Sequence, residues 1–257
     1  MADALDELRQ KVSLSCRILG NELQDETGHV SVRIPGSDEM YLRCRDGRGY
    51  GLIGTKPHQV RRVDFDGKGD DLGSEYAAPN ESPLHGEIYR ARPDINAVVH
   101  VHPFYALLCG ITGVEFKPLF GGYEPPAARI AIAGVPILHR ASTITSKELA
   151  LLAVEAMGDR DIILLRGHGI AAAGASVQEA TVLAIEFERL SKVLYYVAAT
   201  GRTPLELPPE DIARYDAKNL KRSEFRKQRT QSHDLPAADD SGWARYVTAL
   251  DRAAGLV

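Results

Sequence analysis

The segment Asn96-Ala97-Val98-Val99-His100-Val101-His102-Pro103 is an apolar run that ends in two histidines two residues apart. Its apolar character predicts a buried β-strand. Because alternate side chains of a strand leave from the same face, His100 and His102 would lie side by side while Val101 points to the opposite face. Two imidazoles in this arrangement are typical of a site that binds one metal ion.

A second apolar run supplies a third histidine. Asp161-Ile162-Ile163-Leu164-Leu165 predicts another buried strand, which runs into Arg166-Gly167-His168-Gly169. Glycines on both sides free the backbone to turn His168 toward a pocket. Glu81 lies about twenty residues before the histidine pair, where a helix is predicted to begin. Three imidazoles and one carboxylate suit a catalytic divalent metal with an open coordination position.

These segments together resemble the class II aldolase/adducin family. That family carries a Pro-Ser-Ser-Glu-x-x-x-His segment, then a His-x-His on a strand, then a later histidine. The matching residues in this chain lie between about residues 5 and 200 and are Pro79-Asn80-Glu81, His85, His100, His102 and His168. The resemblance implies a three-layer α/β/α sandwich with a central mixed, largely antiparallel sheet. It also implies a homotetramer with the metal site near a subunit interface.

Composition narrows the class of protein. The chain has 257 residues, of which 44% are hydrophobic and 26% charged, with a net charge of −4. We therefore expect one domain over residues 1–257 and no nucleic-acid partner, since binding to a phosphate backbone needs a basic excess. Cys16, Cys44 and Cys109 are scattered and odd in number, which favours reduced thiols in the cytoplasm. We expect no signal peptide and no membrane span.

Periodicity outlines the remaining elements. An amphipathic helix is predicted over residues 3–23, followed by a meander of short strands over 30–34, 40–44, 51–53 and 60–65. Further helices are predicted over 83–91, over 145–157 with a Thr145-x-x-Glu148 capping box, and from Ser176 to about residue 200. Residues 204–257 form a C-terminal extension, whose charged part from Arg222 to Ser241 is expected to be mobile or draped on the surface. Trp243 and Tyr246 are candidates to anchor its end.

Three departures from the family motifs bear on the substrate. The phosphosugar aldolases of the family hold phosphate with a Gly-Asn pair, a Ser-Gly or Thr-Gly pair and the paired serines. The counterparts here are Gly28-His29, Thr55-Lys56 and Pro79-Asn80. A histidine and a lysine add bulk and a long cationic donor, which suits a planar carboxylate or phenolate better than a phosphate. Alternatively, Lys56 is a solvated loop residue and His29 a turn residue.

The family also includes metal-dependent decarboxylases of hydroxylated aromatic or pyridine dicarboxylates, and this chain looks more like those members. Decarboxylation and aldol cleavage both leave electrons that must move to an oxygen, where a Lewis-acidic metal stabilises them. Glu81 would transfer a proton. His85 would either support Glu81 or simply pack within its helix. Zinc or manganese is the expected metal, and iron or cobalt is also compatible with these ligands.

Four interpretations stay open at this point. The first is decarboxylation of a small hydroxylated aromatic or heteroaromatic carboxylate, and the second is a class II aldolase acting on a non-phosphorylated hydroxy-keto substrate. The third is a non-haem iron oxygenase acting on an aromatic hydroxy acid, and the fourth is an adducin-like interaction domain, which would be expected to have lost the ligands. The candidate substrate-binding residues are His29, Thr55, Lys56, Asn80, Tyr123 and Arg129. For Tyr123 and Arg129, a rigid structural turn is the alternative explanation.

Overall fold

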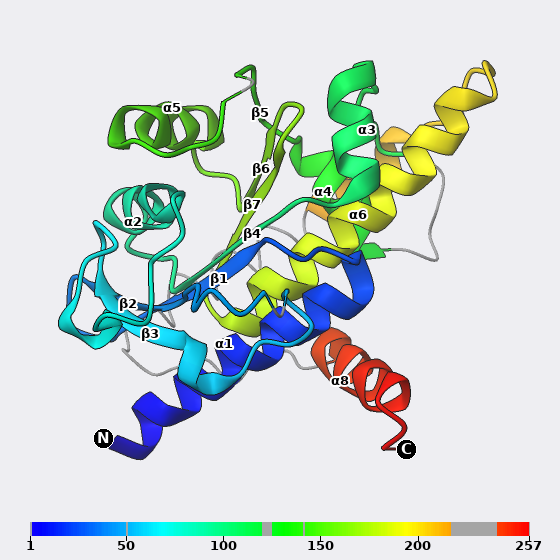
Figure 1. The fold of residues 1–257 in the computed structure, drawn as a ribbon. Helices are drawn as coiled ribbons and strands as arrows, with labels where there is room; N and C mark the ends of the chain where they lie inside the picture. Colours follow the sequence, from blue (N-terminus) through cyan, green and yellow to red (C-terminus); the bar gives the residue numbers. More distant parts are fainter. Residues whose placement is uncertain (1, 50, 120–124, 141, 217–240, 257) are drawn as a thin grey trace.

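A seven-stranded sheet forms the centre of the molecule (Figure 1), in the order β3-β2-β1-β4-β7-β6-β5. The computed structural model describes residues 2–49, 51–119, 125–140, 142–216 and 241–256. All neighbouring strands are antiparallel except β5 and β6, which are parallel. The sheet is therefore mixed and largely antiparallel, as the sequence predicts.

The strands are short, and helices lie between and around them. The strands are β1 His29–Arg33, β2 Glu39–Arg43, β3 Val60–Asp64, β4 Ala97–Val101, β5 Ile137–Leu138, β6 Ile162–Leu165 and β7 Gly169–Gly174. The helices are α1 Ala2–Leu23, α2 Ser82–Ala91, α3 Phe104–Thr112, α4 Pro125–Ala133, α5 Lys147–Met157, α6 Val177–Ala199 and α8 Ser241–Ala253. Two 3₁₀ turns, Pro57–Gln59 and Asp70–Leu72, flank β3.

The helices form a layer on each face of the sheet (Figure 1). Helices α2 and α5 cover one face, with a core that includes Leu84, Val98 and Ala153. Helices α1, α6 and α8 cover the other face, with a core that includes Val12, Val99 and Phe187. Val98 and Val99 belong to opposite cores because successive strand residues point to opposite faces. The architecture is the predicted three-layer α/β/α sandwich.

Pairing between β1 and β4 sets the positions of the polar residues on the α2 side of the sheet. His29 pairs with His100 and Ser31 pairs with Val98. His29, Ser31 and His100 lie in alternate positions of their strands, so they share one face with Val98. Helix α2 lies across this face, and it can present residues four apart to the same strip of sheet.

Some predicted elements differ from the structure. Residues 51–54 form a turn instead of a strand, because Gly51 adopts a φ of +61° and the Thr55 amide donates to the Leu52 carbonyl. The N-cap of α5 is Ser146, whose hydroxyl accepts from the Leu149 amide, so the Thr145-x-x-Glu148 capping box is wrong by one residue. The predicted cap of α6 is confirmed, since Ser176 accepts from the Glu179 amide. Strands β5 and β7 have no counterpart in the prediction.

The end of the chain packs against the body of the protein. Trp243 and Tyr246 of α8 are buried in the core formed with α1 and α6, which confirms their predicted role as anchors. The Tyr246 hydroxyl also donates to Glu186 Oε1 at 2.8 Å. The polar segment expected to be mobile, residues 222–241, lies outside the described residues except at its last position. Within the described ranges, no helix has both the length and the apolar character needed to cross a membrane.

Candidate metal centre

Four side chains that the sequence singles out converge at one point. Glu81, His100, His102 and His168 each offer one ligand atom, and these atoms all lie within 4.8 Å of one another. They come from four places: the N-cap of α2, the interior of β4, the residue just after β4, and the turn between β6 and β7. The sequence prediction that these residues meet is confirmed by the geometry.

His100 is fully buried in β4 and is oriented by a backbone carbonyl. Its Nδ1 lies 2.9 Å from the Ile170 carbonyl oxygen of the neighbouring strand. A carbonyl only accepts, so Nδ1 carries the proton and Nε2 presents a lone pair. Burial lowers the pKa of His100 below its ordinary value, although Glu81 acts in the opposite direction. His100 is therefore a neutral imidazole whose Nε2 faces the cluster.

His102 is oriented by a carboxylate from a distant part of the sequence. Asp25 Oδ2 accepts from the His102 backbone amide at 2.7 Å and lies 3.1 Å from the ring Nδ1. Burial would raise the pKa of Asp25, but hydrogen bonds from His102 outweigh it and hold that pKa well below its usual range. The ionised carboxylate fixes the proton of His102 on Nδ1 and leaves Nε2 as a ligand atom.

His168 lies in a tight turn between antiparallel strands. Leu165 pairs with Gly169, and the His168 amide donates to the Leu165 carbonyl. Gly167 has a φ of +70°, a conformation that favours glycine. At Gly169 a Cβ atom would lie 2.5 Å from the Val101 carbonyl oxygen, so a side chain has no room there. The two glycines thus allow the turn to bring the imidazole against β4.

Glu81 places one carboxylate oxygen in the cluster and anchors the other. Oε1 accepts from the Ile144 amide at 2.8 Å, while Oε2 lies 3.1 Å from His100 Nε2 and 3.3 Å from His168 Nε2. Burial would raise the pKa of Glu81, but its contacts with the imidazoles of His100 and His168 and with the Ile144 amide prevail and lower it far below its ordinary value. The carboxylate is therefore ionised.

This donor set fits a divalent cation. His100 Nε2 carries no proton, yet it faces Glu81 Oε2 at 3.1 Å and His168 Nε2 at 3.2 Å. The lone pairs of His100 Nε2 and Glu81 Oε2 have no proton between them and repel, and a cation bound by both removes that repulsion. Three imidazoles and one carboxylate are ligands that zinc and other divalent transition metals accept. The cluster is therefore suited to hold one metal ion.

A buried polar chain lies beside the cluster. His29 Nδ1 lies 2.7 Å from His85 Nε2, and Ser31 Oγ lies 2.6 Å from His85 Nδ1 and 2.7 Å from the Tyr89 hydroxyl. The rings of His29 and His100 are 4.9 Å apart between centroids. His85 thus bonds to His29 and Ser31, and in the described part of the chain it makes no hydrogen bond to Glu81, the residue that it would support in one of the two alternatives drawn from the sequence.

The other predicted substrate residues are dispersed. Thr55 is buried and Lys56 is exposed, and both line a hollow of about 560 Å³ together with residues of α1. Asn80 is exposed and accepts a hydrogen bond from Arg45 at 3.0 Å. Arg129 is half-buried in α4, and Tyr123 lies outside the described residues. A role in substrate binding stays a prediction for all of these residues.

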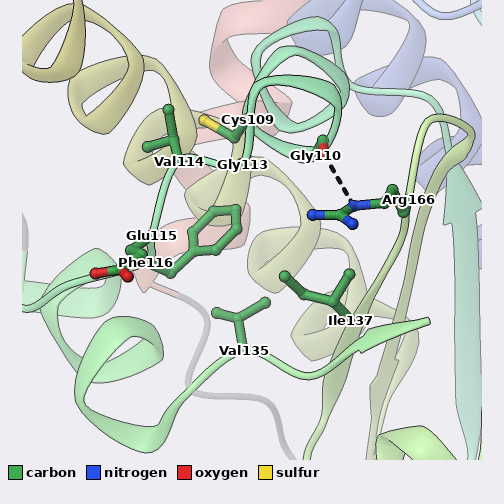
Figure 2. A pocket seen from close by; sticks show the side chains of 9 residues that line it. All are labelled: Cys109, Gly110, Gly113, Val114, Glu115, Phe116, Val135, Ile137 and Arg166. Atoms are coloured by element: carbon green, nitrogen blue, oxygen red, sulfur yellow. Dashed lines mark hydrogen bonds between the residues drawn. The ribbon is translucent and has the colours of Figure 1, made fainter. Parts of the chain in front are cut away.

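A smaller hollow of about 320 Å³ lies next to α3 and the turn that carries His168 (Figure 2). Val114, Phe116, Val135 and Ile137 form apolar walls, and the guanidinium of Arg166 lies at its edge. Arg166 Nε donates to the Gly110 carbonyl at 3.1 Å. Of the predicted site residues that the structure describes, none lines this hollow.

Sequence reasoning missed the residues that orient the ligands. Asp25 and the Ile170 carbonyl act across strand pairs that are far apart in sequence, and no local pattern marks them. Ser31 and Tyr89 did have a signal, because Ser31 follows His29 by two residues on a strand and Tyr89 follows His85 by four on a helix. Both spacings place the paired residues on a common face.

The comparisons with known proteins agree with this geometry. The family model "Class II Aldolase and Adducin N-terminal domain" matches residues 15–195. The chain is 39% identical over 210 residues to a 3,4-dihydroxyphthalate decarboxylase of Arthrobacter keyseri, covering 80% of this chain and 84% of that protein. It is 38% identical over 209 residues to a 3,4-dihydroxyphthalate decarboxylase of Terrabacter sp. strain DBF63, covering 80% and 87%.

Among solved structures, an aldolase II superfamily protein from Pseudomonas syringae superimposes with a TM-score of 0.74 at 19% identity, covering 96% of this chain and 93% of that one. At this identity the likeness concerns the fold, and it agrees with the three-layer sandwich described above. The family model and the two relatives rest on sequence and cover most of the chain. The chain therefore belongs to the class II aldolase and adducin family.

Proposed function

We propose that this chain is a metal-dependent lyase that removes carbon dioxide from a small hydroxylated aromatic dicarboxylate, with 3,4-dihydroxyphthalate as the leading candidate. The observation that carries the proposal is the complete ligand set, Glu81 with three histidines, in a chain whose relatives are named as decarboxylases of that compound. An adducin-like interaction domain would have no need to keep four ionisable side chains within 4.8 Å of one another.

Decarboxylation requires an atom that accepts the electron pair of the broken bond and a group that protonates the ring carbon. When the bond from ring to carboxylate breaks, its electrons must pass through the ring to the oxygen of a hydroxyl group, where a divalent ion held by the four residues would supply positive charge. Glu81 is ionised and accepts the proton of that hydroxyl. It delivers this proton to the ring carbon that carries the carboxylate, so that the electrons of the breaking bond can move to the oxygen as carbon dioxide leaves. The products are carbon dioxide and the phenolate of the shortened acid, so atoms and charge balance.

The neighbourhood of the ligands suits a planar anion. His29 stands beside His100, in the position that the phosphosugar aldolases fill with a smaller residue, and Arg129 and Lys56 are the cationic residues that the sequence predicts for substrate binding. We propose that these groups hold the carboxylate that does not react. Binding energy spent on that carboxylate would place the reacting one in a less solvated position.

The remaining details of the proposal follow from the ligand chemistry and the family. Zinc or manganese is the proposed metal, one ion per subunit, because imidazole and carboxylate ligands accept either. We propose a homotetramer with the active site near a subunit interface, working in the cytoplasm. Metal analysis of the purified protein and its mass in solution test the first two points directly.

The deciding experiment measures carbon dioxide release from hydroxyphthalates, hydroxybenzoates and pyridine carboxylates, with and without oxygen. Decarboxylation predicts equal release in both conditions and loss of activity after chelation, with recovery when zinc or manganese is added. A requirement for oxygen would indicate the oxygenase. Cleavage of hydroxy-keto acids to an aldehyde and a ketone, with no carbon dioxide from the panel, would indicate the aldolase.

A further inference from the structure

The polar chain beside the metal centre connects two secondary-structure elements in alternation. His29 and Ser31 come from β1, and His85 and Tyr89 come from α2. The contacts run from strand to helix, back to the strand and again to the helix, at 2.7, 2.6 and 2.7 Å. All four residues are buried. A buried proton inside such a network needs an acceptor, whereas a proton at an end that opens toward a binding site can be bonded by water or by a ligand.

The order of donors and acceptors follows from the Tyr89 end of this polar chain. Tyr89 has one hydroxyl proton, and Ser31 Oγ is the acceptor that the described residues place against it. If Ser31 donated to Tyr89 instead, the phenol proton would be buried without a partner, which is unfavourable.

Once Tyr89 donates, each later step is determined. Ser31 gives its single proton to His85 Nδ1, so this nitrogen is bare and the ring proton of His85 lies on Nε2. Burial lowers the pKa of His85 to about 3, which keeps the ring neutral with one proton. His85 Nε2 then donates to His29 Nδ1. The proton of His29 is left on Nε2, at the end of the chain nearest the metal centre.

We propose that Tyr89, Ser31 and His85 are positioning residues that fix His29 as a hydrogen-bond donor through Nε2 toward an anionic oxygen of the substrate. His29 pairs with the ligand His100 across the strands, with ring centroids 4.9 Å apart, so an oxygen bound beside the metal is within its reach. A donor at this point selects carboxylate or phenolate oxygens and disfavours groups that can only donate. This inference rests on the proposed function for the identity of the substrate, but the assignment of the protons does not.

A neutron structure of the purified metal-containing enzyme tests the proton assignment without substrate. We expect deuterium on Nε2 of both His29 and His85, and on the Tyr89 hydroxyl directed at Ser31. Deuterium on Nδ1 of His29 or His85 would overturn the inference. Because this result does not depend on turnover, it stands or falls separately from decarboxylation.

Substitutions at His29 test whether donation matters for binding. Gln places an amide N–H near the position of Nε2, whereas Glu places only acceptors there. We expect His29→Gln to keep KM for the dicarboxylate within about threefold and His29→Glu to raise KM by about tenfold to a hundredfold, the range for a hydrogen bond to a charged group. Metal content should be unchanged in both variants. Equal effects of the two substitutions on KM would contradict the donor role.

The supporting chain is tested at Ser31. Ser31→Ala leaves His85 Nδ1 without its donor, so both histidines are free to take the opposite tautomer. We expect the neutron structure of this variant to show deuterium on both ring nitrogens of His29 at partial occupancy, with KM raised and kcat changed less. Ser191→Ala removes another fully buried serine, whose hydroxyl donates to the Phe187 carbonyl away from the site, and serves as the matched control. An unchanged His29 tautomer in Ser31→Ala would refute the positioning role.

Discussion

Asp25 binds His102 at two points: its Oδ2 atom accepts from the backbone amide at 2.7 Å and lies 3.1 Å from the ring Nδ1. The carboxylate therefore fixes both the position of the backbone and the tautomer of the ring. Asp25→Asn keeps the shape of the side chain but removes the charge and half of the acceptor capacity. We expect the metal affinity to fall about tenfold to a hundredfold, as for other changes to groups that orient metal ligands.

Competition with a chelator measures this affinity. Asp159→Asn is a suitable control, since the Asp159 side chain is 91% exposed and pairs only with Arg160 among the ion pairs found. An Asp25→Asn protein that binds metal as tightly as the parent would show that His102 needs no such support.

The histidine ligands themselves give the most direct prediction. The His100→Ala/His102→Ala double variant should lose both metal and activity, because two of the three imidazoles are gone. His139→Ala replaces an exposed histidine outside the cluster and should keep one metal ion per subunit. Elemental analysis of the purified variants makes the comparison, and stoichiometric metal in the double variant would disprove the site.

Glu81→Gln separates chemistry from metal binding. Glutamine retains an oxygen to accept from the Ile144 amide, so the fold and the position of the side chain should persist. It cannot accept and return a proton, so turnover should fall by about two to four orders of magnitude. Circular dichroism and metal content check that the variant is intact, with the exposed residue Glu155 changed to Gln as the control. Near-normal turnover would exclude Glu81 as the acid–base group.

Lys56→Met tests the choice of substrate class. If Lys56 holds the second carboxylate, loss of its charge should raise KM by about tenfold or more for a dicarboxylate and much less for a monocarboxylate, with metal content unchanged. Lys68→Met, at another exposed lysine, controls for the loss of a surface charge. Equal KM values for parent and variant would leave Lys56 as a surface residue at the hollow beside α1.

The three cysteines provide a pH-dependent prediction. Burial raises the pKa of Cys16 and of Cys44 to about 12, and that of Cys109 to about 11. In the unfolded chain these thiols ionise near their ordinary pKa, so folding favours the protonated form. The corresponding stability is complete below about pH 8.5 and is lost as pH rises toward 11–12.

Two measurements check this behaviour. A thiol reagent at pH 8 should react with none of the three cysteines in the native protein and with all of them in denaturant. Thermal unfolding should occur at progressively lower temperature above about pH 9. Fast labelling of the native protein at pH 8 would contradict the burial of these thiols.

Part of this structure was predictable because its signals are local. The His100–His102 pair needs only the alternation of a strand, and His168 needs only a turn allowed by its glycine neighbours. The cap of α6 at Ser176 is equally local. The orientation of the ligands was not predictable, because Asp25 reaches His102 across a separation of 77 residues. The sequence around Asp25 shows no periodic or motif signal that points to His102 at the end of β4.

The errors have a similar origin. Gly51-Leu52-Ile53 has the composition of a strand, but the positive φ of Gly51 and the bond from the Thr55 amide to the Leu52 carbonyl close a turn. For His85, which follows Glu81 by four residues, the sequence left open whether it supports Glu81 or packs within its helix. That spacing puts the two residues on one side of the helix, but α2 directs His85 toward β1, and the partners of Glu81 come from β4 and the β6–β7 turn.

The alternating hydrogen bonds between β1 and α2 also fix the position of the helix along the strand. A slide of α2 by one helical turn would put Tyr89 in the place where His85 bonds to His29 and Ser31, so the present pairings of the row would be lost. Gly86 adds a steric stop, since a Cβ atom there would come within 1.8 Å of the Phe65 carbonyl oxygen. The Glu81 carboxylate at the N-terminus of α2 is thus held in register by contacts made one and two turns further along the helix.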